Sequence, residues 1–193
     1  MRDSQSLESI PKLPLGKLFQ LEFQSVRTEE PLLCDLEEMV RRKSLSAYQA
    51  VRVPCIVEHA GLILSDYEAQ SFPGSLTQPM WDAINAEAFL RSCHPLSKRA
   101  IARAVIGYCD GFSIQTFVGD TAGQLADKPR GSRAFYWDTV FCPDGGGGKT
   151  YAEIAEGGKE GLKEKLALSQ SVKALKRFME YRIQHEPVLF PTL

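Results

Sequence analysis

The chain has 193 residues, of which 44% are hydrophobic and 24% are charged, with 23 basic and 24 acidic side chains. This balance is typical of a soluble globular protein with one domain and a sizeable core, and it excludes collagen-like, disordered and disulfide-scaffold classes. The formal net charge of −1 gives no basic field for nucleic acid or an anionic membrane, so a few placed cations must hold any anionic ligand.

Cysteine usage indicates reduced thiols in a cytoplasmic protein, because five cysteines are scattered without a C-x-x-C spacing. The three histidines are far apart, which argues against a zinc site; only Cys93 and His94 are neighbours. The N-terminal stretch is polar and contains neither a signal-peptide core nor a membrane-spanning run.

The first half of the chain alternates helical and extended patterns. Residues 35–51 have the apolar spacing of a helix, and residues 53–57 form a short apolar run typical of a buried strand. The other elements expected here are a short helix over 3–10, strands over 17–26 and 61–64, a turn over 71–75, and a helix from Pro79 through Ile84.

The second half contains the strongest strand signal. Residues 112–118 alternate strictly, and Gly119-Asp120 predicts a hairpin turn with an antiparallel return over 121–125. Residues 97–108 favour neither helix nor strand. The remaining expectations are a strand over 134–142, a glycine loop over 145–148, a long helix over 159–183 and a proline-rich tail over 183–193. With no internal repeat or linker, the pattern indicates one α/β or α+β domain over 1–193.

The string DGGGGKT is similar to a phosphate-binding loop but lacks one required glycine, since Pro143 stands five positions before Gly148. It therefore predicts a mobile surface loop, with a flap that closes over a ligand as the functional alternative.

Two acidic positions are candidates for chemistry. Glu58 and His59 follow the apolar strand, where a pair of this kind can bind a metal or move a proton; a partly exposed pair without chemistry is the alternative. Asp138 is a lone carboxylate inside YWDTVF and needs a partner if it is buried. Phosphate contacts or plain solvation remain open for the lysines Lys43, Lys149, Lys159, Lys163 and Lys165.

Three segments in order carry a resemblance to a known family. They are VPCIVEHAGLILSDYEAQSFPG over 53–74, the succession FVGDTAGQ, PRG and FYWDTVFCPD over 117–144, and KTYAE followed by EK and a closing helix over 149–178. Together they resemble the inosine triphosphate pyrophosphatase family over roughly residues 3–180. The resemblance implies an elongated mixed β-sheet flanked by helices, with two lobes around a central cleft and a homodimeric assembly.

The resemblance also implies an activity: hydrolysis of a non-canonical purine nucleoside triphosphate to the monophosphate and pyrophosphate, with Mg²⁺ on the phosphates. Residue by residue, it implies metal binding by Glu30 and Glu58, with Glu58 and His59 at the catalytic position. It implies substrate contacts for Lys43, Phe72, Pro73, Gly74, Trp137, Asp138, Lys165, Ser169 and Gln170.

The chain departs from the family pattern at three places. Its start, Met1 to Ser6, lies where the family has the loop after its first strand, and it lacks that loop's glycine and lysine. His59 stands where the family has an Asp, and Gln170-Ser171 stand in place of a base-reading His-Arg. Imidazole is a poor ligand for Mg²⁺, although it can serve as a base near neutral pH.

Two functions therefore follow as hypotheses. The first is a divergent nucleoside-triphosphate pyrophosphatase, with the triphosphate held by Lys43, Lys165 and Lys149. The second is a catalytically impaired relative that binds a nucleotide or a protein partner through the old cleft.

Overall fold

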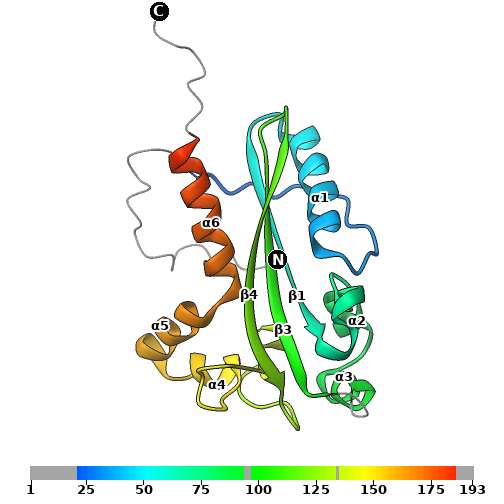
Figure 1. Ribbon diagram of the computed structural model, residues 1–193, viewed down its shortest axis with the longest axis vertical. Helices are drawn as coiled ribbons and strands as arrows, with labels where there is room; N and C mark the ends of the chain where they lie inside the picture. The colour runs from blue at the N-terminus through cyan, green and yellow to red at the C-terminus, as the bar shows by residue number, and fades with distance from the viewer. Residues whose placement is uncertain (1–20, 94–96, 134, 186–193) are drawn as a thin grey trace, which may run out of the picture.

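Three long antiparallel strands form the centre of the structure, a computed structural model that describes residues 21–93, 97–133 and 135–185 (Figure 1). The five-stranded sheet has the order β2-β1-β3-β4-β5, and all four strand pairs are antiparallel. Its strands are β1 (Cys55–Leu64), β2 (Pro73–Gly74), β3 (Arg99–Cys109), β4 (Ile114–Leu125) and β5 (Phe141–Pro143).

Helices cover both faces of this sheet. The helical elements are α1 (Leu36–Val51), η3 (Ser65–Gln70), α2 (Thr77–Ala83), α3 (Ala86–Cys93), η4 (Tyr136–Thr139), α4 (Tyr151–Ala155), α5 (Gly158–Leu168) and α6 (Gln170–Gln184). In Figure 1, α1 and α6 lie on opposite sides of the long strands. No helix within the described ranges is long and apolar enough to cross a membrane.

Side-chain alternation along β1 and β3 assigns one set of residues to each helix. Val57 and Val105 pack against Met39 and Val40 of α1. The even-numbered residues turn the other way: Ile56, Ala60, Ala104 and Ile106 belong to the cluster that packs on Ala174 and Phe178 of α6. A third cluster at the far end of the sheet joins α3, η4, β5 and α4 around the buried rings of Phe89, Trp137, Phe141 and Tyr151.

Helix α1 confirms the expectation over 35–51, and it begins where Asp35 caps it. The Asp35 carboxylate accepts hydrogen bonds from the backbone N–H groups of Glu37 at 2.8 Å and Glu38 at 3.1 Å. The two expected strands over 53–57 and 61–64 are one strand, β1, and the ambiguous segment 97–108 lies largely within β3.

Four expected elements differ from the structure: the strand over 17–26, the hairpin turn at 119–120, the strand over 134–142 and the single helix over 159–183. Residues 21–26 of the expected strand 17–26 carry no strand; Leu21 and Phe23 are 52% and 69% exposed, and no strand of the described residues pairs with them. Gly119 lies inside β4 and not in a turn. The position requires a glycine because a Cβ there would approach the Gln170 carbonyl oxygen of α6 to 2.1 Å. The expected helix 3–10 and most of the tail lie outside the described residues.

The segment 134–142 was expected to be a strand, but η4 occupies its centre. Trp137, Asp138 and Thr139 are buried in succession, which a strand with one exposed face does not allow. The expected long helix over 159–183 is divided at Ser169, which ends α5 and caps α6.

The α/β sheet flanked by helices is confirmed. The mixed pairing is not found among the described strands, which pair antiparallel throughout. The division into two lobes around a cleft stays a prediction.

Candidate functional site

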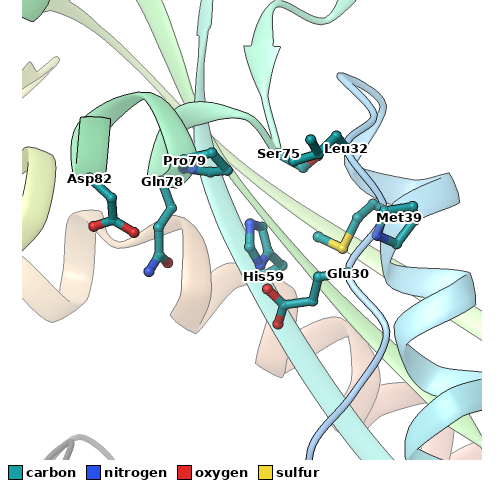
Figure 2. Close-up of a pocket in the computed structure, with 9 residues that line it drawn as sticks. Glu30, Leu32, Met39, His59, Ser75, Gln78, Pro79 and Asp82 are labelled. Atoms are coloured by element: carbon teal, nitrogen blue, oxygen red, sulfur yellow. The ribbon is translucent and has the colours of Figure 1, made fainter. Parts of the chain in front are cut away.

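A cavity of about 130 Å³ lies where the segment before α1 meets β1 and α2 (Figure 2). Figure 2 shows Glu30 entering from that segment, His59 from the strand, and Gln78 and Asp82 from α2. The lining residues are Glu30, Pro31, Leu32, Met39, His59, Ser75, Gln78, Pro79 and Asp82. The wall therefore combines carboxylate, imidazole and carboxamide groups with a few apolar contacts.

Lys43 connects this cavity to helix α1. It lies one turn beyond the buried Met39 and Val40, so its side chain runs over the sheet and only 16% of it is exposed. Its Nζ lies 2.7 Å from Oε1 of Glu30 and donates a hydrogen bond to the Glu58 carbonyl at 3.3 Å. The structure thus joins Lys43 and Glu30 in an ion pair.

His59 contributes an imidazole whose Nε2 atom is buried and has no hydrogen-bond partner within the described part of the chain. Burial lowers the pKa of His59 below its ordinary value of 6.5, and the positive charge of Lys43 lowers it further. Glu30 and a backbone hydrogen bond with Ser75 act in the opposite direction without reversing the shift. The ring is therefore neutral near pH 7 and has a lone pair available.

Glu58 and His59 are neighbours in sequence, but the structure does not bring their side chains together. Both lie within the regular ladder of β1 and β3, where Glu58 is opposite Ile106 and His59 is opposite Val105. Ile106 faces α6 and Val105 faces α1, so the Glu58 carboxylate lies on the other face of the sheet from the cavity. Only the backbone of Glu58 reaches the cluster, through its carbonyl.

The donor set of the cavity differs from the one that Mg²⁺ prefers, which is octahedral oxygen from carboxylates, water and phosphate. Nowhere in residues 21–93, 97–133 and 135–185 do three His, Cys, Asp or Glu side chains gather to hold a metal ion. The cavity offers carboxylates from Glu30 and Asp82, and an orphaned imidazole nitrogen from His59. These residues do not fit a resident magnesium ion, and a cation here requires additional ligands from a bound phosphate.

A second cluster of expected residues surrounds Asp138 in η4. Asp138 is 4% exposed and forms an ion pair with Lys165 of α5. The ammonium group also lies 5.5 Å from the centre of the Phe135 ring and 5.7 Å from that of Tyr151. Burial raises the pKa of Asp138 above its ordinary value, and Lys165 only partly offsets this. Asp138 thus has the partner that a buried carboxylate requires.

Ser169 and Gln170 lie at the junction of α5 and α6. The Ser169 hydroxyl accepts a hydrogen bond from the Val172 N–H at 3.5 Å and so caps α6. Gln170 is 6% exposed, and its Oε1 accepts a hydrogen bond from the Tyr151 hydroxyl at 3.1 Å. Tyr151 thereby fixes the carboxamide of Gln170.

Phe72, Pro73 and Gly74 lie apart from both polar clusters. Phe72 and Pro73 line a separate cavity of about 480 Å³ with mostly apolar neighbours, among them Leu64, Met80 and Phe89. Gly74 pairs with Leu62 of β1 at a φ of 56°, a conformation that favours glycine. This short strand positions Ser75 beside the His59 cavity.

Sequence reasoning missed Gln78 and Asp82, because α2 shows no polar motif. Gln78 donates a hydrogen bond from Nε2 to the Tyr136 hydroxyl at 3.0 Å, which links the His59 cavity to η4. The glycine loop is held by Arg130, which donates to the Gly148 carbonyl at 2.6 Å and pairs with Glu153 at 3.0 Å. Lys149 is exposed and α4 has only five residues, so this loop does not form the phosphate-binding turn considered from sequence.

Similarity to known proteins extends over nearly the whole chain. The model of the Ham1 family matches residues 5–181. A protein of Methanopyrus kandleri named dITP/XTP pyrophosphatase is 32% identical over 148 residues, 76% of this chain and 74% of that protein. A protein of the same name from Saccharolobus solfataricus is 31% identical over 170 residues, 86% of this chain and 84% of that protein.

A solved structure gives the same result for the fold. The Staphylococcus aureus Ham1 protein superposes with a TM-score of 0.64 at 22% identity, covering 84% of this chain and 82% of that one. The family predicted from the motif succession is thus supported by similarity in both sequence and fold. The chain belongs to the Ham1 family.

Proposed function

We propose that this chain hydrolyses nucleoside triphosphates of the non-canonical purine type to the monophosphate and pyrophosphate. The joining of Glu30, Lys43 and His59 at one cavity carries the proposal, because a triphosphate reaction requires charge compensation beside a proton acceptor. Family membership supports it, since the related archaeal proteins are named dITP/XTP pyrophosphatase and a Trypanosoma cruzi relative is named inosine triphosphate pyrophosphatase.

In this proposal, Lys43 binds phosphate oxygens and neutralises part of the triphosphate charge. His59, whose lowered pKa keeps it neutral, accepts a proton from the attacking water. Glu30 is the carboxylate that would face a divalent cation brought in by the triphosphate, and such a cation would supply electrostatic stabilisation of the phosphate charge. Glu58 acts only through its carbonyl, which positions Lys43.

The purine base of the substrate is proposed to lie toward the second cluster, the one around Asp138. The second cluster contains Trp137, Asp138, Lys165, Ser169 and Gln170, which contacts through Tyr151 and the Asp138–Lys165 ion pair bring together. The hydrogen bond from Gln78 to Tyr136 connects this cluster to the His59 cavity. Phe72, Pro73 and Gly74 support the proposal indirectly, by positioning Ser75. We extend it to a homodimeric, cytoplasmic enzyme formed by residues 1–193 as one unit, with sedimentation as the test of the dimer.

The proposal is tested by measuring pyrophosphate release from dITP, XTP and ITP. ATP and GTP are tested separately as substrates, to measure specificity. We expect turnover of dITP, XTP and ITP, and much less turnover of ATP and GTP. Replacing Lys43 by Met is expected to lower kcat/KM by about 10- to 100-fold, the value of a lost charge-assisted contact of about 1.5–3 kcal/mol.

The matched control for this experiment is Arg42→Met. Arg42 is adjacent to Lys43 on the same helix but pairs with Glu38 in solvent, with 53% of its side chain exposed. Its replacement should leave kcat/KM unchanged. If none of the five nucleotides releases pyrophosphate while binding is measurable, the proposed hydrolysis is wrong and a binding role takes its place.

A further inference from the structure

Two of the free cysteines, Cys55 and Cys109, lie directly opposite each other in the central sheet. Cys55 is the first residue of β1 and Cys109 the last residue of β3, and they are Cα partners in the antiparallel ladder. Opposite residues of neighbouring strands direct their side chains to the same face of a sheet, so the two thiols are neighbours. Both thiols are free in this structure, and the proposed hydrolysis uses neither of them.

The direction of the hydrogen bonds along β1 shows what kind of pair they form. The Leu62 N–H points away from β3, because it donates a hydrogen bond to the Thr77 hydroxyl at 2.9 Å. Cys55 lies an odd number of residues before Leu62 on an unbroken ladder, so its N–H and C=O point toward β3. Hydrogen-bonded pairs of this kind have Cα atoms about 5.5 Å apart, a separation at which disulfides are common.

The position of this pair at the end of the ladder lets the two strands adjust. A disulfide requires the two Cβ atoms to come about 1 Å closer than they usually are in such a pair. Among the described residues, no further pair of β1 with β3 lies beyond Cys55 and Cys109 to oppose that movement. Strain that remains makes the bond easier to reduce, as in labile and regulatory disulfides.

The surroundings of the two thiols give them different roles. Cys109 is only 3% exposed, whereas Cys55 is half-buried and in partial contact with solvent. Burial and, to a smaller extent, Cys109 raise the pKa of Cys55 to about 11, so the two sulfur atoms are close enough to interact. Cys55 therefore meets a dissolved reagent first and Cys109 reacts second. The high pKa makes the first step slow near pH 7.

We propose that Cys55 and Cys109 are a reversible oxidation site, at which a low-molecular-weight disulfide is the oxidant. The Cys55 thiolate attacks one sulfur of that disulfide, whose S–S bond breaks and releases the first small thiol. The Cys109 thiolate then attacks the Cys55 sulfur of the mixed disulfide and releases the second small thiol. The two protein thiols lose two electrons, which reduce the oxidant, and their two protons end on the released thiols.

The new bond fastens the end of the sheet beside α1. Tyr48 of α1 packs on the turn that follows Cys109, since a Cβ at Gly111 would approach the Tyr48 hydroxyl to 2.2 Å. A cross-link between Cys55 and Cys109 also closes a long loop and so constrains the unfolded chain. We expect the oxidised protein to unfold at a temperature about 5–10 °C higher than the reduced protein.

The test incubates the reduced full-length protein with oxidised glutathione, blocks the remaining thiols by alkylation and maps the peptides by mass spectrometry without reduction. We expect a peptide pair joined through Cys55 and Cys109, a higher unfolding temperature, and reversal of both by dithiothreitol. The rate of bond formation should rise about tenfold per pH unit between pH 7.5 and pH 9, because the thiolate fraction of Cys55 does so below its pKa.

Variants of the two cysteines and a matched control make the result specific. Cys55→Ser should remove the cross-link and the gain in unfolding temperature, and Cys109→Ser should stop the reaction at a glutathione adduct on Cys55. The control is Cys34→Ser, which should behave as the parent protein. Cys34 is half-buried like Cys55 and lines the larger apolar cavity together with Cys93, so these two are the competing pair.

The outcomes are independent of the proposed hydrolysis, since no nucleotide enters the experiment. Circular dichroism verifies that each variant is folded; if Cys109→Ser is not, the Cys55→Ser protein and the peptide map of the parent decide. A bond between Cys34 and Cys93 in place of the expected one would overturn the inference. So would glutathione adducts without a bond between Cys55 and Cys109, or a gain in unfolding temperature that persists in Cys55→Ser.

Discussion

At the scale of single residues, His59 links the pH dependence of stability to the cavity. Burial and Lys43 lower its pKa in the folded protein below the ordinary 6.5. A lowered histidine pKa means that the unfolded chain binds the proton more readily, so stability is lost as the pH falls from about 6.5 through the folded pKa.

Replacing His59 by Gln should remove this part of the pH dependence. Urea unfolding of the metal-free proteins between pH 7.5 and pH 5 measures it, as the difference between the parent and His59→Gln. With the two curves aligned at pH 7.5, we expect the stability of the parent to fall below that of His59→Gln as the pH is lowered. Parallel curves would show that His59 titrates equally in both states.

Lys165 is the second residue with a sharp consequence, because it neutralises the buried Asp138. Lys165→Met leaves that carboxylate uncompensated and should lower the free energy of unfolding by about 3–5 kcal/mol. The double variant Lys165→Met, Asp138→Asn removes the charge as well and should recover much of the loss. Thermal unfolding at pH 7 measures both, and a double variant no more stable than the single one would contradict this explanation.

At the scale of the element, helix α1 matters because it carries Lys43 to the cavity. Its N-terminus depends on the carboxylate of Asp35, which accepts two backbone hydrogen bonds. Asp35→Ala should lower the free energy of unfolding by about 1 kcal/mol, whereas Asp35→Asn retains a capping oxygen and should change it by much less. Urea denaturation of the three proteins measures this, and equal losses in both variants would reject the cap.

At the scale of the whole molecule, sequence patterns predicted elements where local rules dominate. Residues 35–51 combine a capping Asp with helical spacing, and the helix begins and ends as expected. Gly119 misled the prediction because the reason for a glycine there is α6, more than fifty residues away in sequence. The η4 turn was missed for a similar reason: its three consecutive buried residues are covered by tertiary contacts that no local pattern reveals.

The candidate site was predictable in composition but not in geometry. Glu30 and His59 line one cavity, and Lys43 reaches it through its ion pair with Glu30. Glu58 was expected beside them because it is adjacent in sequence, but the two-residue period of a strand separates it from His59. Gln78 and Asp82 were not expected, since nothing in the sequence indicates which helix closes the cavity.

The antiparallel pairing of β3 with β4 also determines the order in which the sheet can assemble. Cys109 pairs with Ile114 across a turn of four residues, in which the Asp110 carboxylate accepts hydrogen bonds from the Phe112 and Ser113 N–H groups. The innermost contact of β1 with β3 joins Leu64 to Ala100, so a far longer segment must close. Because loop-closure entropy rises with loop length, the β3–β4 hairpin is the least costly nucleus of the sheet. We therefore expect the strand that bears His59 to join this nucleus afterwards, so that the cavity forms late in folding.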